Sequence, residues 1–362
     1  MHQRILILSI LLAASGCNQK QQEQATATVD VPSNIKPLVV TEPAAHDTDD
    51  PAIWINKEDP SQSLIIGTDK GGDEGVGGLY VYDLEGHIIK EKTVSGIQRP
   101  NNVDIAYGLK AGDKMLDIAV CTERYTNSIR IFSLPDIQPL DNGGIEVFEG
   151  EALRDPMGIA LFTNPETNEI SAIVGRKSGP TDSTYLWQYN LIADSTGMVQ
   201  VQLLRKFGAF SGIKEIESIA VDNELGYVYY SDEGTGTHKY YAHPDSTGTE
   251  LALFGSGDFK DDNEGISIYK MDGGKGYILI SDQQANRFNI YAREGSATNP
   301  HEHKLLGAVN TSTNESDGSD VTSIPLGTKF PQGLFVAMSD DKTFQLYSWS
   351  DIIQPLDQPA DN

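Results

Sequence analysis

Short apolar strand patterns, separated by turns rich in glycine, aspartate and asparagine, run from about residue 37 to residue 350, and few stretches are helix-like. One strand ending recurs six times, as VYDL, IFSL, QYNL, YAHP, IYAR and LYSW, with an aromatic residue at the same place. These residues are Tyr82, Phe132, Tyr189, Tyr241, Tyr291 and Tyr347, so the steps between them are 50, 57, 52, 50 and 56 residues. A strand repeat of this period predicts a β-propeller whose core contains these aromatic side chains.

Two further strand patterns precede each aromatic strand, and an outer strand follows it. The second strands read LIIGTDK, DIAVCTER, SAIVGRK, YVYYSDE, YILISDQ and LFVAMSD. The first strands read DDPAIWIN, NNVDIAYGL, MGIALFTN, ESIAVDNE, EGISIYKM and DVTSIPL. The outer strands read HIIKEKTV, IEVFEGE, VQVQLLRKF, ELALFG and HKLLGAV, and the last blade has none. The segment PLVVTEP (37–43) is left over, so we expect it to close the ring as the missing outer strand.

The pattern therefore predicts an all-β fold, a six-bladed propeller of four-stranded antiparallel blades that occupies residues 37–356, with a short tail at 357–362. Residues 1–16 combine Arg4, an apolar core and small residues, which is typical of an export signal. The following segment, 17–36, is polar and rich in glutamine, which predicts a flexible tether.

The sequence Ala14-Ser15-Gly16-Cys17 resembles the lipobox of bacterial lipoproteins, so we expect Cys17 to carry a lipid anchor. Because Asn18 is not aspartate, the outer membrane is the expected location, at its periplasmic or surface face. The alternative is a secreted protein in which Cys17 is incidental. Cys121 lies in an apolar strand and is expected in the core.

The formal net charge of -25 argues against nucleic acid or an anionic membrane surface as partner, so membrane contact is expected only through the lipid anchor. A closed propeller has no need of a second subunit, and a monomer is expected. His301 and His303 are expected in a solvated loop rather than in a zinc site, because no third ligand of that type is near in sequence.

Polar residues gather at one end of every blade, where first strands begin and second strands end, and we call this end the mouth. The first strands begin at Asp49, Asp50, Asn101, Asn102, Glu217, Asp262, Glu264, Asp317 and Asp320. The second strands end at Lys70, Arg124, Lys177, Glu233 and Gln283. Crowded carboxylates repel one another unless cations lie among them, and oxygen ligands without His or Cys favour Ca²⁺. The neighbouring lysines and arginine suit an anionic ligand, so the pattern predicts a metal-assisted site for a polyphosphorylated small molecule.

Several segments together resemble the β-propeller phytases over almost the whole of residues 37–350. They are HDTDDPAIW (46–54), LIIGTDK (64–70), GGLYVYDL (77–84), RPNNVDI (99–105), DNEGISIY (262–269), GKGYILISDQ (274–283) and FPQGLFVA (330–337). The resemblance implies hydrolysis of phytate (myo-inositol hexakisphosphate) with several Ca²⁺ ions. It implies calcium ligands at Asp50, Pro51, Asn101, Val103, Glu217, Glu233, Asp262, Glu264, Gln283 and Asp317. It further implies that Lys70, Arg124 and Lys177 grip phosphate and that Glu217 takes part in catalysis.

Two positions in the third blade depart from the family pattern. Met157 stands where the family has a tyrosine, and Ser178 stands where it has a glutamate. A second hypothesis is therefore a phytase-like propeller that binds calcium and inositol phosphates with weak or no catalysis. A third is a propeller lactonase with one calcium ion, but a neutral lactone would leave Lys70, Arg124 and Lys177 without a charge to bind.

Overall fold

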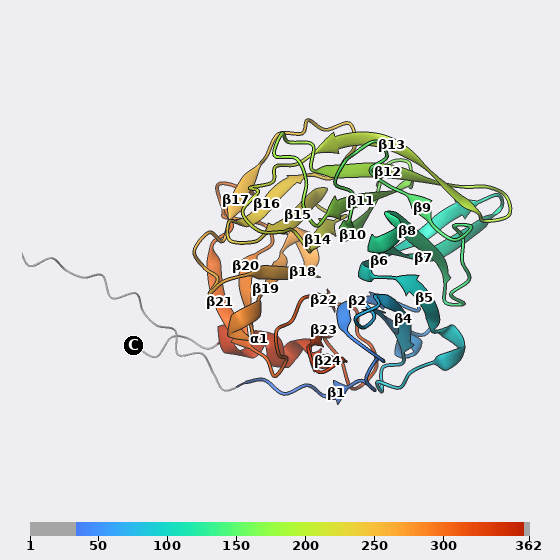
Figure 1. The fold of residues 1–362 in the computed structure, drawn as a ribbon. Helices are drawn as coiled ribbons and strands as arrows, with labels where there is room; N and C mark the ends of the chain where they lie inside the picture. Colours follow the sequence, from blue (N-terminus) through green and yellow to red (C-terminus); the bar gives the residue numbers. More distant parts are fainter. Residues whose placement is uncertain (1–33, 358–362) are drawn as a thin grey trace, which may run out of the picture. The chain divides into compact units, whose positions relative to one another are not determined.

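Six four-stranded antiparallel sheets follow one another around a central axis in the computed structural model, which describes residues 34–357 (Figure 1). These residues belong to one compact unit. The first two blades contain β2 (Thr48–Trp54), β3 (Leu64–Asp69), β4 (Val76–Tyr82) and β5 (Val94–Gln98), then β6 (Pro100–Ala111), β7 (Lys114–Glu123), β8 (Ser128–Leu134) and β9 (Ile145–Glu146). The next two contain β10 (Pro156–Thr163), β11 (Ile170–Arg176), β12 (Leu186–Ala193) and β13 (Val199–Phe207), then β14 (Ile219–Asp222), β15 (Tyr227–Asp232), β16 (Gly236–Tyr241) and β17 (Ala252–Phe254).

The fifth blade contains β18 (Asn263–Lys270), β19 (Gly276–Asp282), β20 (Arg287–Ala292) and β21 (Leu305–Asn310). The sixth contains β22 (Ser319–Thr322), β23 (Leu334–Ser339) and β24 (Thr343–Ser348), and its fourth strand is β1 (Val39–Val40). Val39 pairs with Leu346 and Val40 with Gln345 in antiparallel register. The predicted closure of the ring by the N-terminal strand is thus confirmed, and the edge of β24 is covered.

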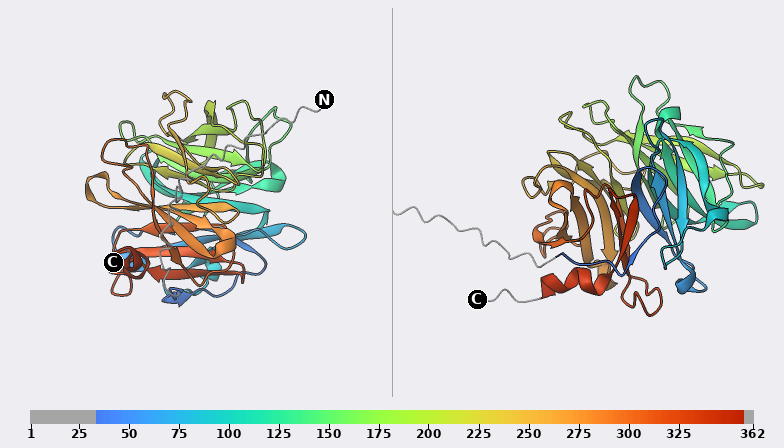
Figure 2. Two further views of the ribbon diagram at one scale, coloured as in Figure 1. Left: turned by 90° about the vertical axis from the view of Figure 1, so that its left-hand side faces the viewer. Right: turned by 60° about the horizontal axis from the view of Figure 1, so that its bottom comes forward.

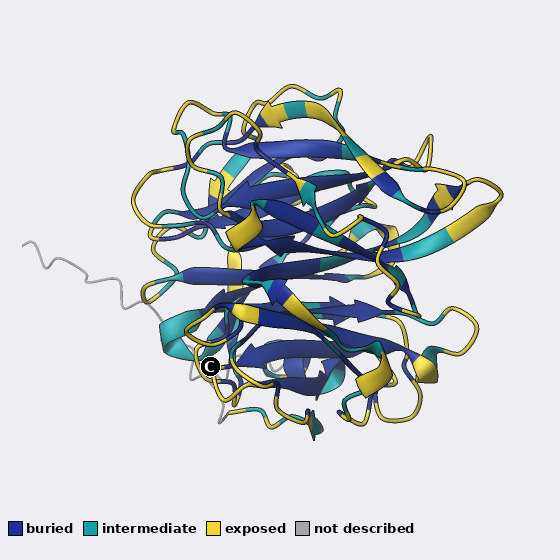
Figure 3. Ribbon diagram, turned by 45° about the vertical axis from the view of Figure 1, so that its right-hand side comes forward, coloured by how far each residue is buried: buried dark blue, intermediate teal, exposed yellow. Residues whose placement is uncertain are grey.

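The core lies between neighbouring sheets, and Figure 3 shows that the strands are mostly buried while many loops are exposed. Between the first and second blades, for example, Ile66 and Val81 share one apolar cluster with Val103 and Cys121. Burial of such side chains contributes about 1.5–3 kcal/mol each, so blades that cannot bury their faces alone are held together as a ring. Cys121 lies in the core as predicted.

The chain ends in α1 (Trp349–Asp357), which the repeat did not predict and which packs on the last two blades (Figure 2). The Trp349 ring stacks on Tyr269, with ring centroids 3.7 Å apart. Ile352 and Ile353 enter the same apolar cluster. Within residues 34–357, no helix combines the length and the apolar character that a bilayer span requires.

Two expectations about the blades were wrong. Tyr241 is exposed and Tyr240 takes the core position, because Tyr240 pairs with Val228 in the way that Tyr291 pairs with Ile278. The motif was thus read one residue out of register in the fourth blade. The outer strand of the first blade begins at Val94, because residues 90–92 form a 3-10 turn.

His303 is buried rather than solvated. Its Nδ1 lies 2.8 Å from the Ala292 carbonyl oxygen and its Nε2 lies 3.1 Å from Lys239 Nζ. The expected signal and most of the expected tether, with Cys17, lie outside the described residues, and so does most of the tail. The end of the expected tether is described, and there Ile35 N donates to the Asn310 carbonyl at 2.8 Å.

Candidate metal and phosphate site

The inner strands of neighbouring blades approach one another closely at the mouth. Gly265 N donates to the Asp317 carbonyl at 2.8 Å, and a Cβ at Gly265 would lie 2.8 Å from that oxygen and 2.9 Å from Gly318 Cα. A Cβ at Gly158 would lie 2.5 Å from the Glu217 carbonyl oxygen. Glycine at these positions lets the strand starts converge, so their acidic side chains face a common space.

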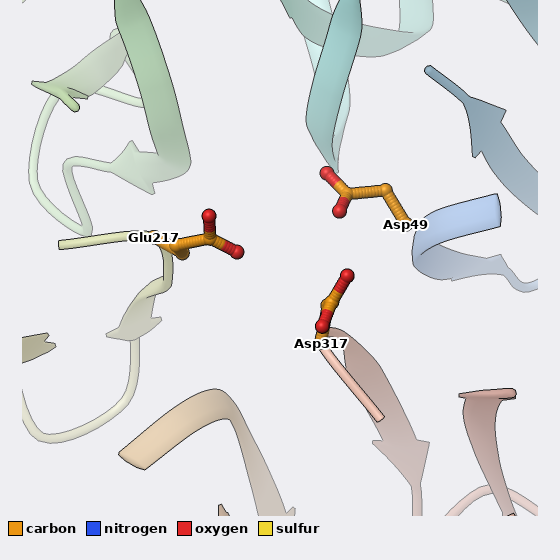
Figure 4. A group of neighbouring side chains, drawn as sticks. All are labelled: Asp49, Glu217 and Asp317. Carbon is orange, nitrogen blue, oxygen red and sulfur yellow. The ribbon is translucent and has the colours of Figure 1, made fainter. Parts of the chain in front are cut away.

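The first cluster consists of Asp49, Glu217 and Asp317, which come from three different blades and point toward one another (Figure 4). One carboxylate oxygen of each lies within 4.8 Å of the others. Lys70 is the cation of this cluster, since its Nζ lies 3.0 Å from Asp49 Oδ1 and 2.9 Å from Asp317 Oδ2.

The second cluster shares Glu217 with the first and adds Glu215 and Glu233, whose carboxylate oxygens again lie within 4.8 Å. Lys177 is its cation, with Nζ 2.5 Å from Glu215 Oε2. The buried Glu264 interacts electrostatically with Glu217 and Glu233. The mouth therefore holds a continuous row of acids in which Glu217 belongs to both halves.

Burial and mutual repulsion disfavour negative charge on most of these groups. Burial, followed by the charges of neighbouring acids, raises the pKa of Glu217 and of Glu264 well above the ordinary value. Burial also raises the pKa of Glu233 to about 8, and that of Asp317 to about 7. Burial opposes the charge of Asp49 too, but Lys70 outweighs it, and the pKa of Asp49 is lowered.

Several oxygens in this row are buried and have no hydrogen-bond partner within residues 34–357. They are Asn101 Oδ1, Glu233 Oε1 and Glu264 Oε2. Unpaired buried acceptors are rare and costly, and a bound divalent cation would satisfy them and offset the repulsion. The donor set therefore fits Ca²⁺, as the sequence predicted.

The remaining expected ligands lie in two places. At the mouth, Asn101 Nδ2 donates to Asp49 at 3.0 Å, Gln283 Nε2 donates to Asp317 at 2.5 Å, and Asp262 pairs with Lys214. Asp262 also interacts electrostatically with Glu233 and Glu264.

Asp50, Pro51 and Val103 line a cavity of about 510 Å³ together with residues from the inner strands of other blades. Asp50 Oδ2 accepts from Val103 N at 3.0 Å. Asp320, which we expected among the mouth carboxylates, also lines this cavity, because its carboxylate accepts from Ile53 N and Val321 N. The expected ligand set is thus divided between the mouth and the cavity.

Arg124 is the third expected cation, and it is buried beside Met157. Its guanidinium contacts the Met157 sulfur, and its Nε has no partner within the described part of the chain. Arg124 interacts electrostatically with Asp49, so Lys70 and Arg124 both act on the first cluster. Met157 thus places a thioether, which is only a weak acceptor, against a site arginine. Ser178 follows directly after Lys177 and is half-buried.

Two residues of the site were missed by the sequence analysis. Glu215 lies two residues before Glu217, and the Glu-x-Glu spacing within a loop was the signal for it. Arg99 precedes Pro100 at the start of β6 and interacts electrostatically with Asp47, which pairs with Lys70 at 3.7 Å. Asp49 was expected at the mouth but not among the ligands.

Comparisons with known proteins find relatives of this chain. The sequence matches the Phytase family over residues 3–361. A 3-phytase from Bacillus subtilis (strain 168) is 28% identical over 333 residues, which cover 86% of this chain and 82% of that protein.

The solved structures that match include a nidogen/laminin complex, with a TM-score of 0.42 and 15% identity over 79% of this chain and 92% of the other. They also include the Dos1 propeller, with a TM-score of 0.42 and 13% identity over 82% of this chain and 66% of the other. The family assignment rests on the sequence matches alone. The chain belongs to the phytase family.

Proposed function

We propose that this protein is a calcium-dependent phosphatase that hydrolyses the phosphate monoesters of phytate. The observation that carries the proposal is the row of buried acceptors at the mouth, unpaired within residues 34–357, beside Lys70, Arg124 and Lys177. A site made only of acids would repel phosphate. A site made only of cations would not contain unpaired buried oxygens. The combination suits a site that holds metal ions and phosphate together.

The mouth residues that would hold calcium are Asn101, Glu217, Glu233, Asp262, Glu264, Gln283 and Asp317, with Asp49 and Glu215 added from the geometry. Asp50, Pro51 and Val103 would hold calcium in the central cavity. When bound, calcium neutralises carboxylate and phosphate charge and lowers the pKa of a bound water.

The protein's own groups bind and orient the phosphate. Lys70 and Lys177 are held by carboxylates on opposite halves of the acidic row, so a phosphate between them would contact an ammonium on each side. Arg124 brings a planar set of donors that matches two phosphate oxygens. Glu217 belongs to both carboxylate clusters, and in this proposal it lies beside the reacting phosphate. As charge shifts among the phosphate oxygens, these fixed cations stabilise the transition state.

A second candidate is a propeller that binds inositol phosphates without hydrolysing them, and the Met157 contact with Arg124 favours it. Phosphate release from phytate in calcium, measured beside phytate binding, separates the two. An enzyme releases phosphate in repeated turnovers, whereas a binding protein binds phytate and releases none. The variants Met157→Tyr and Ser178→Glu should raise the release rate if these residues limit catalysis.

The predictions of a lipid anchor at Cys17, an outer-membrane location and a monomeric state remain proposals. Metabolic labelling with a fatty acid, compared between the full chain and Cys17→Ala, tests the anchor. Sedimentation of the chain from residue 34 onward tests the monomer.

A further inference from the structure

The last residue of the second strand has a buried side chain in all six blades, and it bonds to the segment that leads into the first strand of the same blade. These residues, which we call the clamp residues, are Asp69, Glu123, Arg176, Asp232, Asp282 and Ser339, each at most 3% exposed. In five blades a side-chain oxygen accepts from a backbone N–H, that of Asp47, Gln98, Ser211, Lys260 or Asn314. In the third blade Arg176 donates instead to the Leu153 carbonyl.

The residue after each clamp residue bonds to the same entering segment through its backbone. Its N–H donates to a carbonyl oxygen at 2.7–3.2 Å, from Lys70 to Asp47, Arg124 to Arg99, Lys177 to Asp155, Glu233 to Glu215, Gln283 to Asp262 and Asp340 to Asn314. The backbone groups of a loop need such partners when they are shielded from water. Each clamp residue therefore fixes the end of a second strand, with its site residue, against the start of a first strand.

The clamp of the fourth blade holds the largest group of expected metal ligands. Asp232 Oδ2 accepts from Ser211 N at 2.7 Å, and Asp232 Oδ1 accepts from Ser211 Oγ at 2.6 Å. Ser211 begins the segment that carries Glu215 and Glu217, and Glu233 follows Asp232 directly. These three glutamates form the second carboxylate cluster. One buried aspartate thus joins the two pieces of chain that supply this cluster.

Asp232 is itself held in place by its neighbours. His238 Nε2 lies 3.2 Å from Asp232 Oδ2, and His238 Nδ1 lies 2.5 Å from Glu250 Oε2. The His238 ring stacks on Tyr230, with ring centroids 4.7 Å apart. Both oxygens of Asp232 therefore have partners, and the segment at Ser211 cannot shift without losing two hydrogen bonds.

We propose that Asp232 is a positioning residue of the metal site, which holds Glu215 and Glu217 at the distance from Glu233 that a shared calcium ion needs. This inference rests on the proposed function and adds to it a residue that touches neither metal nor phosphate. The three carboxylates repel one another when no cation lies among them, so the metal-free loop would move away unless it were held. Groups that orient metal ligands from outside the site change metal affinity about 10–100-fold.

The test titrates calcium alone into the metal-free full chain and measures the heat of binding. Asp232→Asn keeps the size of the side chain but only one acceptor oxygen, so the apparent Kd for calcium should rise about tenfold. Asp222→Asn is the matched control, because Asp222 is equally buried in the same blade but lies at the end of β14, away from the mouth, where it pairs with Arg293. Its apparent Kd should stay within about twofold of wild type.

Ser211→Ala separates position from charge, because it removes one of the two bonds to Asp232 and changes no charge. Ser211 is exposed, so this variant should fold even if Asp232→Asn does not. Its apparent Kd for calcium should rise about threefold. Ser61→Ala is its control, since Ser61 is also exposed and its Oγ also donates to a carboxylate at 2.6 Å, that of Asp59, in the turn at the opposite end of the first blade.

Thermal unfolding in chelator identifies a role that is only structural. Both aspartate variants should unfold at a lower temperature than wild type, because each loses bonds of a buried carboxylate. Only the variants at Asp232 and Ser211 should also bind calcium more weakly. Unchanged calcium affinity in Asp232→Asn and Ser211→Ala, or an equal loss of affinity in both aspartate variants, would overturn the inference.

The calcium titration decides the inference independently of turnover. If wild type releases no phosphate from phytate, the proposed function fails, yet Asp232→Asn and Ser211→Ala should still bind calcium more weakly than their controls. If wild type releases phosphate and both variants bind calcium as wild type does, the proposed function stands and the inference fails. An absence of calcium binding by wild type would refute both.

Discussion

Lys70 Nζ lies 2.9 Å from Asp317 Oδ2, although 247 residues separate them along the chain. The same ammonium lies 3.0 Å from Asp49 Oδ1. Burial acts to lower the pKa of Lys70, but Asp49, Asp317 and Asp47 outweigh it and the pKa is raised. A permanently charged lysine thus lies inside the acidic row, as the proposed binding of phosphate beside metal ions requires.

Replacing Lys70 with methionine should lower kcat for phosphate release on the order of 100-fold, because a fixed donor to the developing charge is lost. The same change leaves Asp49 and Asp317 without their cation. Steady-state kinetics of Lys70→Met, with Lys114→Met as an exposed control, measure the effect. An activity within about threefold of wild type would show that Lys70 does not contact the reacting phosphate.

Glu217→Gln should separate stability from calcium binding. Removing one charge from both carboxylate clusters relieves repulsion, so the chelated variant should unfold on the order of 2 °C above chelated wild type. The variant should gain less from added calcium, because it has lost a ligand. Thermal unfolding with chelator and with calcium gives both the unfolding temperature without metal and the increase that calcium causes. The assignment of Glu217 would be contradicted if the chelated variant unfolded at a lower temperature than chelated wild type and calcium raised its unfolding temperature as much as that of wild type.

Much of the fold could be predicted from the sequence, because each blade repeats the same strands and the leftover N-terminal strand had one open edge to fill. The mouth followed from strand direction alone, which is why Lys70, Glu217 and Glu264 were placed together. Strand direction alone did not predict where each side chain points. Asp320 is one residue into its strand, and it turns into the central cavity to accept backbone N–H groups.

The register of the fourth blade was misread because Tyr240 and Tyr241 are adjacent, and only pairing with Val228 shows which is buried. Arg99 was missed for a different reason. Its backbone is left-handed and its Nε has no hydrogen-bond partner within residues 34–357, and neither feature has a sequence signature.

Gly265→Ala should destabilise the ring by about 1–3 kcal/mol, because the new methyl group would lie 2.8 Å from the Asp317 carbonyl oxygen and push the fifth and sixth blades apart. Denaturant unfolding measures the loss. Gly72→Ala is the control, since the nearest atom to its Cβ would be 3.5 Å away. Equal stability of the two variants would mean that the inner strands can separate without cost.

Acid should lower the unfolding free energy through His303, which contacts Lys239 of the fourth blade and Ala292 of the fifth. Burial, followed by the Lys239 charge, lowers the pKa of His303 from 6.5 to about 4, so the unfolded chain takes up a proton that the folded chain refuses. The unfolding free energy should therefore have its full value above pH 6.5 and fall toward pH 4, by at most about 3 kcal/mol. His303→Gln should flatten this part of the profile. Denaturant unfolding between pH 4 and 7 measures the unfolding free energy of both proteins. The prediction would be contradicted if wild type and His303→Gln showed the same slope of unfolding free energy against pH.

Phosphate release from phytate by a single preparation, first chelated with EDTA and then given calcium, tests the central claim most directly. We expect release to stop in EDTA and to return in full with calcium, and not with magnesium, because the acidic row offers many oxygens in loose geometry. Undiminished release in EDTA, or no release in calcium, would contradict the account.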